Sequence, residues 1–178
     1  IGAEGIGLYQ VASSLFMVLL TIIASGLPLI ISRMSAVNYA QKEEKKQASL
    51  ITVAMIYALI LSILLCVIVL AFKNVFAKFL TDEGCILILI VMLPSLIFSA
   101  VYSVFRGSLW GKGNYFALCV TEFYEQVVRI VVGILVISSS YSAMKNAINI
   151  GWSMTIACFL SMIYVVLLFF YYGGKMGK

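Results

Sequence analysis

The chain has 178 residues, of which 63% are hydrophobic and 11% are charged, and its formal net charge is +5. Soluble domains carry about 25% charged residues, so this composition excludes a water-soluble domain. Histidine is absent, which excludes a Ser–His or Cys–His catalytic pair within the chain. We expect no enzyme activity. The four cysteines form no CxxC pair, and we expect free thiols rather than disulfides or metal ligands.

Five long hydrophobic stretches follow one another along the chain. Each reaches the roughly 20 residues that cross a hydrocarbon core of about 30 Å, and none shows the two-residue alternation of a barrel strand. We therefore predict an all-α integral membrane protein with about five transmembrane helices. The predicted helices cover residues 9–32, 48–72, 85–105, 114–137 and 147–172.

The first predicted helix follows a glycine-rich opening, Gly2 to Gly7, which we interpret as a loop. Because residue 1 is isoleucine and not an initiator methionine, we expect the chain to be a piece of a longer protein. Pro28 follows Gly26 near the end of this helix, and Pro94 lies midway along the third helix. Proline removes an intrahelical hydrogen bond, so kinks are predicted at both prolines.

The connections between the predicted helices alternate in charge, with eight basic residues on one side and three on the other. Basic residues accumulate on the cytoplasmic side of a membrane, so the richer side and the C-terminus are predicted to be cytoplasmic, at the cell membrane. We interpret the Lys42–Lys46 run as a solvated helix end that sets topology, with contact to lipid headgroups as the alternative. The richer side holds Arg33, Lys42, Lys45, Lys46, Arg106, Lys112, Lys175 and Lys178, and the poorer side holds Lys73, Lys78 and Lys145.

Small residues recur at every fourth position along the third predicted helix, at Ser95, Ser99, Ser103 and Gly107. Such a stripe lets two helix backbones approach closely in a membrane. We interpret it as a packing surface, with substrate contact by the serines as the alternative.

The fourth predicted helix carries polar residues in its middle. At 100° per residue, Glu122, Glu125, Gln126 and Arg129 fall within an arc of roughly 100°. Each charged residue near a helix centre costs about 2.5–3.5 kcal/mol on insertion into a membrane. The thirteen Leu, Ile, Val and Phe residues of this helix contribute only roughly 4–8 kcal/mol in favour of insertion. The helix therefore needs polar partners elsewhere in the protein.

Glu125 and Arg129 stand at i and i+4, the spacing of an ion pair, which leaves Glu122 without a local cation. Three arrangements would satisfy Glu122: protonation, pairing with another helix, or a water-filled cavity. A buried polar network that fixes helix register is the structural alternative. A whole polar face favours a cavity, because ionisable residues inside membranes are functional by default.

Four motifs along the chain resemble the stage V sporulation protein B-like, polysaccharide biosynthesis branch of the multidrug/oligosaccharidyl-lipid/polysaccharide (MOP) flippase superfamily. They occur in family order over nearly the whole chain. They are Gly2-Ala3-Glu4-Gly5-Ile6-Gly7-Leu8-Tyr9-Gln10, Gly26-Leu27-Pro28 with Ile31-Ser32-Arg33, Phe105-Arg106-Gly107 with Gly111, and Glu125-Gln126-Val127-Val128-Arg129-Ile130.

The resemblance implies a fourteen-helix transporter with two lobes around a central cavity, in which residues 1–178 form helices two to six of the N-terminal lobe. It implies that Arg33, Arg106 and Arg129 contact an anionic diphosphate. Glu122 and Glu125 would balance charge or couple transport to Na⁺ or H⁺. Membrane anchoring at cytoplasmic helix ends accounts equally well for the first two arginines. The family's first helix and its second lobe are absent from this chain.

We expect a fragment of an exporter or flippase that moves lipid-linked polysaccharide or peptidoglycan precursors across the cytoplasmic membrane by alternating access. The expected partners are membrane lipid, the lipid-linked saccharide and the remainder of the transporter, without nucleic acid or cofactor. The alternatives are a cation-coupled multidrug extruder of the same superfamily and a non-transporting membrane scaffold in envelope assembly. Arg129 favours an anionic headgroup over a cationic drug, because a buried cation repels cationic substrates.

Overall fold

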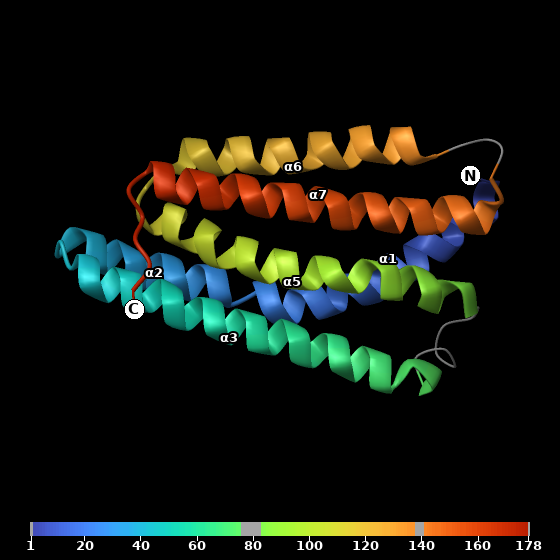
Figure 1. Ribbon diagram of the computed structural model, residues 1–178, viewed down its shortest axis with the longest axis horizontal. Helices are drawn as coiled ribbons and strands as arrows, with labels where there is room; N and C mark the ends of the chain where they lie inside the picture. Colours follow the sequence, from blue (N-terminus) through green and yellow to red (C-terminus); the bar gives the residue numbers. More distant parts are fainter. Residues whose placement is uncertain (1, 76–82, 138–140, 178) are drawn as a thin grey trace.

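The computed structural model describes residues 2–75, 83–137 and 141–177. Within these ranges the chain forms long helices and no strand, which confirms the predicted all-α class. Figure 1 shows the helices lying side by side along the long axis of one bundle. The helices are α1 (Gly2–Ala24), α2 (Leu27–Ala40), α3 (Glu44–Ala71), α5 (Glu83–Gly111), α6 (Tyr115–Val136) and α7 (Ala143–Tyr171).

Four stretches of the described chain are long and apolar enough to cross a membrane, so the chain is a multi-pass membrane protein. They are Gly5–Ala40, Glu44–Ala71, Gly84–Gly111 and Ala143–Tyr171. The helix α6 is not among them, because its three charged residues lie in its middle. It nevertheless extends beside α7 along much of the bundle (Figure 1).

The first hydrophobic stretch differs from its prediction in three ways. It begins as helix at Gly2, so the expected glycine-rich loop is helical. It is broken by a turn at Ser25 and Gly26, where a kink was predicted, and Pro28 lies in the first turn of α2. Proline suits that position because its missing N–H would have no partner there. The helix then continues to Ala40, well beyond the predicted end at residue 32.

The third hydrophobic stretch also extends further than predicted. The helix α5 passes through Pro94 and continues to Gly111, which places Arg106 inside the helix and not in a connection. Both this predicted helix and the first one end directly before an arginine. The helices continue past these arginines because a long side chain can reach polar surroundings while its backbone stays helical. Gly113, with a φ of +81°, follows the end of α5 and provides the left-handed residue that commonly ends a helix.

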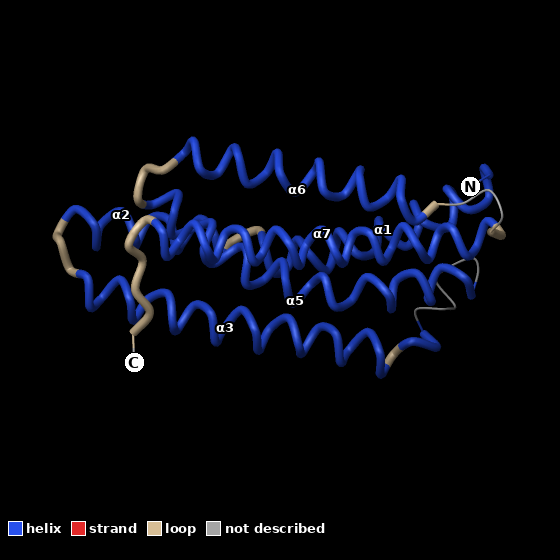
Figure 2. Tube along the Cα trace, turned by 45° about the horizontal axis from the view of Figure 1, so that its top comes forward, coloured by secondary structure: helices blue, strands red, loops and turns tan. Residues whose placement is uncertain are grey.

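The centre of the bundle is α5, which packs against α1, α2, α3 and α7. Its side chains Ile88, Leu89, Met92 and Leu96 are fully buried. Figures 1 and 2 both show α6 and α3 on opposite edges of the bundle. The packing partner of α6 is mainly α7, with fewer contacts to α5. This arrangement leaves the side of α6 that faces α5 only partly filled.

The small-residue stripe of α5 packs partly against α2. A Cβ atom at position 107 would lie 2.8 Å from the Pro28 carbonyl oxygen, and one at position 111 would lie 2.5 Å from the Ser32 carbonyl oxygen. The hydroxyls of Ser95 and Ser103 are buried and donate to carbonyl oxygens of their own helix. Close helix approach therefore accounts for Gly107 of the stripe and for Gly111 one turn further along α5.

A buried polar network joins α2, α3 and α5 near one end of the bundle. The amide nitrogen Nε2 of Gln47 donates to Ser35 Oγ at 2.8 Å and to Ser108 Oγ at 3.1 Å, and Asn38 Nδ2 donates to Gln47 Oε1 at 3.2 Å. Gln47 is 5% exposed. Such a network fixes the register of the three helices, because a buried polar group without a partner is costly.

Three connections meet at that end of the bundle, namely the turn at 41–43, the turn at 112–114 and the segment 172–177 (Figure 1). Lys175 Nζ lies 2.6 Å from Glu44 Oε2, and the Gly177 N–H donates to the Ala48 carbonyl at 3.1 Å. The described basic residues of these connections therefore share one end, as the alternating charge predicted. We call it the basic end. Its cytoplasmic orientation remains a prediction.

Replacing Gly111 with alanine is expected to destabilise the protein by about 1–3 kcal/mol, the usual cost of overpacking a close contact. The new Cβ atom would meet backbone atoms of α2 that cannot move independently. Thermal unfolding of the purified full-length protein would measure this effect. Gly133→Ala is the matched control, because its Cβ would meet only Ser153 Oγ at 3.7 Å. Equal melting temperatures for the two variants would contradict this account of the α2–α5 contact.

Candidate functional site: a polar groove between α5 and α6

The polar face of α6 is connected to α5 by an ion pair between Arg106 and Glu122. Their side chains are 36% and 50% exposed. Of the three arrangements that would satisfy Glu122, the structure contains the pairing with another helix. A short turn at 112–114 joins the two helices. The pair therefore connects the two helices of a hairpin near its turn, where it holds α6 beside α5.

A second ion pair lies deeper along α6, between Glu125 and Arg129. Arg129 Nη2 is 2.7 Å from Glu125 Oε1, and the side chains are 29% and 18% exposed, respectively. This is the i,i+4 pair that the sequence predicted. Tyr124, on the same turn of α6, stacks on Tyr164 of α7 with ring centroids 4.8 Å apart. The stacked rings help to fix the rotation of α6, and in this rotation Glu122 reaches Arg106 of α5.

Three buried polar atoms around these pairs have no hydrogen-bond partner among the described residues. They are Tyr102 Oη, Arg106 Nε and Arg129 Nε. An unsatisfied buried donor or acceptor costs about 1–3 kcal/mol. Each guanidinium therefore keeps donor capacity beyond its carboxylate partner, and a polar molecule in the space between the helices would relieve this cost.

A groove of about 500 Å³ opens between the two helices beside the ion pairs. We call it the α5–α6 groove. A smaller cavity of about 180 Å³ adjoins it at Arg106, Cys119 and Glu122, and extends toward Trp110 and Tyr115. The volume of the groove is in the range of sites for small organic ligands, which is about 300–1,000 Å³. The groove is lined by Tyr102, Arg106, Cys119, Glu122, Phe123, Glu125 and Gln126.

The lipid-facing side of α6 is apolar and adjoins the groove. Phe116 and Phe123 are 80% and 72% exposed, and Ile130 and Ile134 are exposed as well. In a membrane these side chains meet acyl chains or another apolar helix. The groove therefore combines a charged interior with an apolar margin, as an amphipathic ligand requires.

The structure brings five of the six candidate residues together, and it separates one of them. Arg106, Glu122, Glu125 and Gln126 line the groove, and Arg129 pairs with one of its carboxylates. Arg33 is exposed on α2 and does not line the α5–α6 groove. It is also inside α2, and not at the helix end where anchoring was considered.

Three residues that line the groove were absent from the predicted site, namely Tyr102, Cys119 and Phe123. Tyr102 precedes Arg106 by four positions, and Cys119 precedes Glu122 by three, so each shares a helix face with a charged residue. That spacing was the signal that could have identified them. Hydrophobic patterning alone gave no reason to separate this tyrosine or this cysteine from ordinary membrane-spanning residues.

Residues 1–177 match the polysaccharide biosynthesis protein family. Stage V sporulation protein B of Bacillus subtilis (strain 168) is 34% identical to the chain over 131 residues. The aligned region is 73% of this chain and 25% of that relative, so the chain spans about a quarter of the relative's length. No solved structure matches the chain. Because the family match extends over nearly every residue, including both helices of the groove, the chain belongs to the polysaccharide biosynthesis protein family.

Proposed function

We propose that the protein containing this chain moves lipid-linked saccharide precursors across the cytoplasmic membrane by alternating access. The α5–α6 groove would hold part of the diphosphate that joins saccharide to lipid. The observation that carries the proposal is the placement of two arginines and two glutamates around one groove, on a helix too polar to cross a membrane by itself. Family membership supports a role with saccharides and a transport function over catalysis.

The arginines supply the chemistry that an anionic headgroup requires. A guanidinium has five N–H donors and binds phosphate oxygens in bidentate fashion. Arg106 and Arg129 each use one terminal nitrogen for a glutamate and leave a buried Nε without a described partner. Each glutamate neutralises one guanidinium in the absence of substrate. A diphosphate, which carries more negative charge than one carboxylate, would replace the glutamates as the partner of the arginines.

The apolar margin of α6 supplies a path for the lipid portion of such a substrate. Phe116 and Phe123 are strongly exposed beside the groove. A polyprenyl tail could lie against them in the membrane while the headgroup entered the polar interior. The headgroup would then cross the membrane without losing its polar contacts, and the tail would stay in hydrocarbon throughout.

Transport by the full-length protein, reconstituted in vesicles with a fluorescent polyprenyl diphosphate saccharide, tests this function. The movement of the label to the opposite leaflet is expected to be protein-dependent. The same saccharide linked to the polyprenyl chain without the diphosphate is the control, and its movement should be much slower. Equal rates for the two lipids, or movement of neither, would contradict the proposal.

A further inference from the structure

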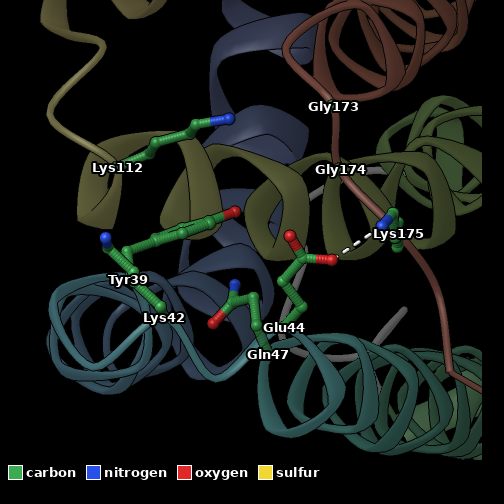
Figure 3. Close-up of a pocket in the computed structure, with 8 residues that line it drawn as sticks. All are labelled: Tyr39, Lys42, Glu44, Gln47, Lys112, Gly173, Gly174 and Lys175. Carbon is green, nitrogen blue, oxygen red and sulfur yellow. Dashed lines mark hydrogen bonds and ion pairs between the residues drawn. The ribbon is translucent and has the colours of Figure 1, made fainter.

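The basic end of the bundle contains a second polar cavity, separate from the α5–α6 groove. It has a volume of about 270 Å³ and lies between the start of α3 and the C-terminal ends of α2, α5 and α7. Figure 3 shows Glu44 and Gln47 reaching it from α3, while Lys112 and Lys175 approach from the opposite side. From these groups we infer that the cavity binds the headgroup of an anionic phospholipid at the membrane surface.

The charge of the cavity is the first argument. Three lysines, Lys42, Lys112 and Lys175, line it together with one carboxylate, Glu44. The carboxylate pairs with Lys175 at 2.6 Å, but both side chains are about 70% exposed, and exposed pairs contribute little to stability. Within the described ranges, neither Lys42 nor Lys112 has a carboxylate at ion-pair distance. The cavity therefore has two cations in excess for an anion.

The fold also positions residues of the cavity. Lys112 Nζ donates to the carbonyl oxygen of Tyr172 and lies 5.4 Å from the centre of the Tyr39 ring. Lys42 is in the left-handed region with a φ of +56°, which costs a residue other than glycine about 1–2 kcal/mol. Gln47 is already anchored by the network that joins α2, α3 and α5. Contacts within the protein thus place Lys112 and Lys175 at the cavity before any ligand arrives.

The depth of the cavity is the second argument, because it identifies a lipid as the occupant. Aromatic residues with one polar end gather where a membrane meets water. At this end of the bundle Trp110 is 40% exposed and Tyr171 is 83% exposed. The surface of α2 near this end is also apolar, since Met34 and Val37 are exposed on the side of the helix away from Tyr39. A headgroup phosphate would reach the lysines while its acyl chains lay along α2.

Basic pockets between membrane helices on the cytoplasmic side are a known way to bind anionic headgroups. The sequence by itself predicts a solvated helix end for the Lys42–Lys46 run. The cavity adds a proposed ligand contact to that interpretation, because the run contributes Lys42 and Glu44 to a cluster with residues distant in sequence. This inference does not depend on the saccharide transport proposed above, since the two cavities share no residue.

The test measures the binding of phosphatidylglycerol to the purified full-length protein by native mass spectrometry, with phosphatidylcholine as the neutral reference. A preference for phosphatidylglycerol is expected. The Lys42→Gln, Lys112→Gln double variant should lose about 30-fold in affinity, or about fivefold for each lysine near the surface. Lys145→Gln is the matched control, since Lys145 also lies over a tyrosine ring, at 4.0 Å from Tyr141, but at the opposite end of the bundle.

Each outcome of this test decides the inference. Loss of binding in the double variant, with normal binding and melting temperature in the control, would support the cavity as the site. Equal affinity in the double variant and the control would overturn it. Inorganic phosphate provides the last arm of the test: if it displaces phosphatidylglycerol at similar concentrations, the cavity binds free phosphate and the lipid is not its ligand.

Discussion

Replacing Arg106 with glutamine is expected to lower the amount of full-length protein in the membrane severely, because it leaves Glu122 on α6 without its cation. A charged residue that has no partner near the centre of a membrane helix costs about 2.5–3.5 kcal/mol. The pair is the contact that connects the polar face of α6 to α5. Immunoblots of membrane fractions would measure the loss, with Lys145→Gln as the control for removal of one positive charge.

The double variant Arg106→Gln, Glu122→Gln distinguishes the structural role of this pair from its functional role. Removing both charges removes the cost of the unpaired one, so membrane abundance should return toward that of the unmodified protein. Transport should stay impaired, because Arg106 would no longer contact the diphosphate. Recovery of both abundance and transport would show that the ion pair is purely structural.

The second large effect is expected at the deeper pair. The Glu125→Gln, Arg129→Gln variant should insert and fold, but its transport rate should fall roughly ten- to hundredfold, since a hydrogen bond to a charged group contributes about 1.5–3 kcal/mol. Arg129→Lys should retain part of the activity, because lysine keeps the charge but cannot bind two phosphate oxygens in one plane. Complementation by the full-length protein, normalised to its abundance in the membrane, would measure both effects.

One result would contradict the proposed contact between Arg129 and the diphosphate of the substrate. If the double variant is present at normal abundance and transports at the full rate, Arg129 only neutralises Glu125. The groove would then rely on Arg106 alone, and the Arg129→Lys variant should be indistinguishable from the unmodified protein.

The helices were predictable from the sequence because a membrane imposes a minimum length on each apolar stretch. Their ends were harder to predict. The charge pattern predicts connections that start at Arg33 and Arg106, yet both residues lie inside helices that continue past them. A charged residue indicates that its side chain reaches polar surroundings, but it does not indicate that the helix ends there. The end of α5 depends instead on the turn that contains Gly113. The sequence predicts only a kink at Pro28, and not a break between two helices at Gly26. The break depends on the close packing of Pro28 against α5, which is a contact distant in sequence.

The site was predictable in part for a similar reason. The pairing of Glu125 with Arg129 follows from spacing on one helix. The partner of Glu122 depends on the relative rotation of two helices, which the Gln47 network and the Tyr124–Tyr164 stack help to fix through α3 and α7. One clue was available: Arg106 precedes the turn at 112–114 by nearly as many residues as Glu122 follows it. An antiparallel hairpin therefore brings the two to a similar depth.

If the α5–α6 groove binds a polar headgroup, it should contain water in the assembled protein and should not be sealed by packing. The most direct measurement compares cysteines at positions 126 and 127 in the full-length protein, in a background in which the exposed native Cys119 is serine. Gln126 lines the groove, whereas Val127 is exposed on the apolar side of α6 at nearly the same depth. A charged thiol reagent modifies the thiolate, which forms only where water reaches the sulfur. Our account predicts rapid modification at position 126, slowed by added polyprenyl diphosphate saccharide, and little at position 127. Failure to modify position 126, or equal modification of the two positions, would contradict it.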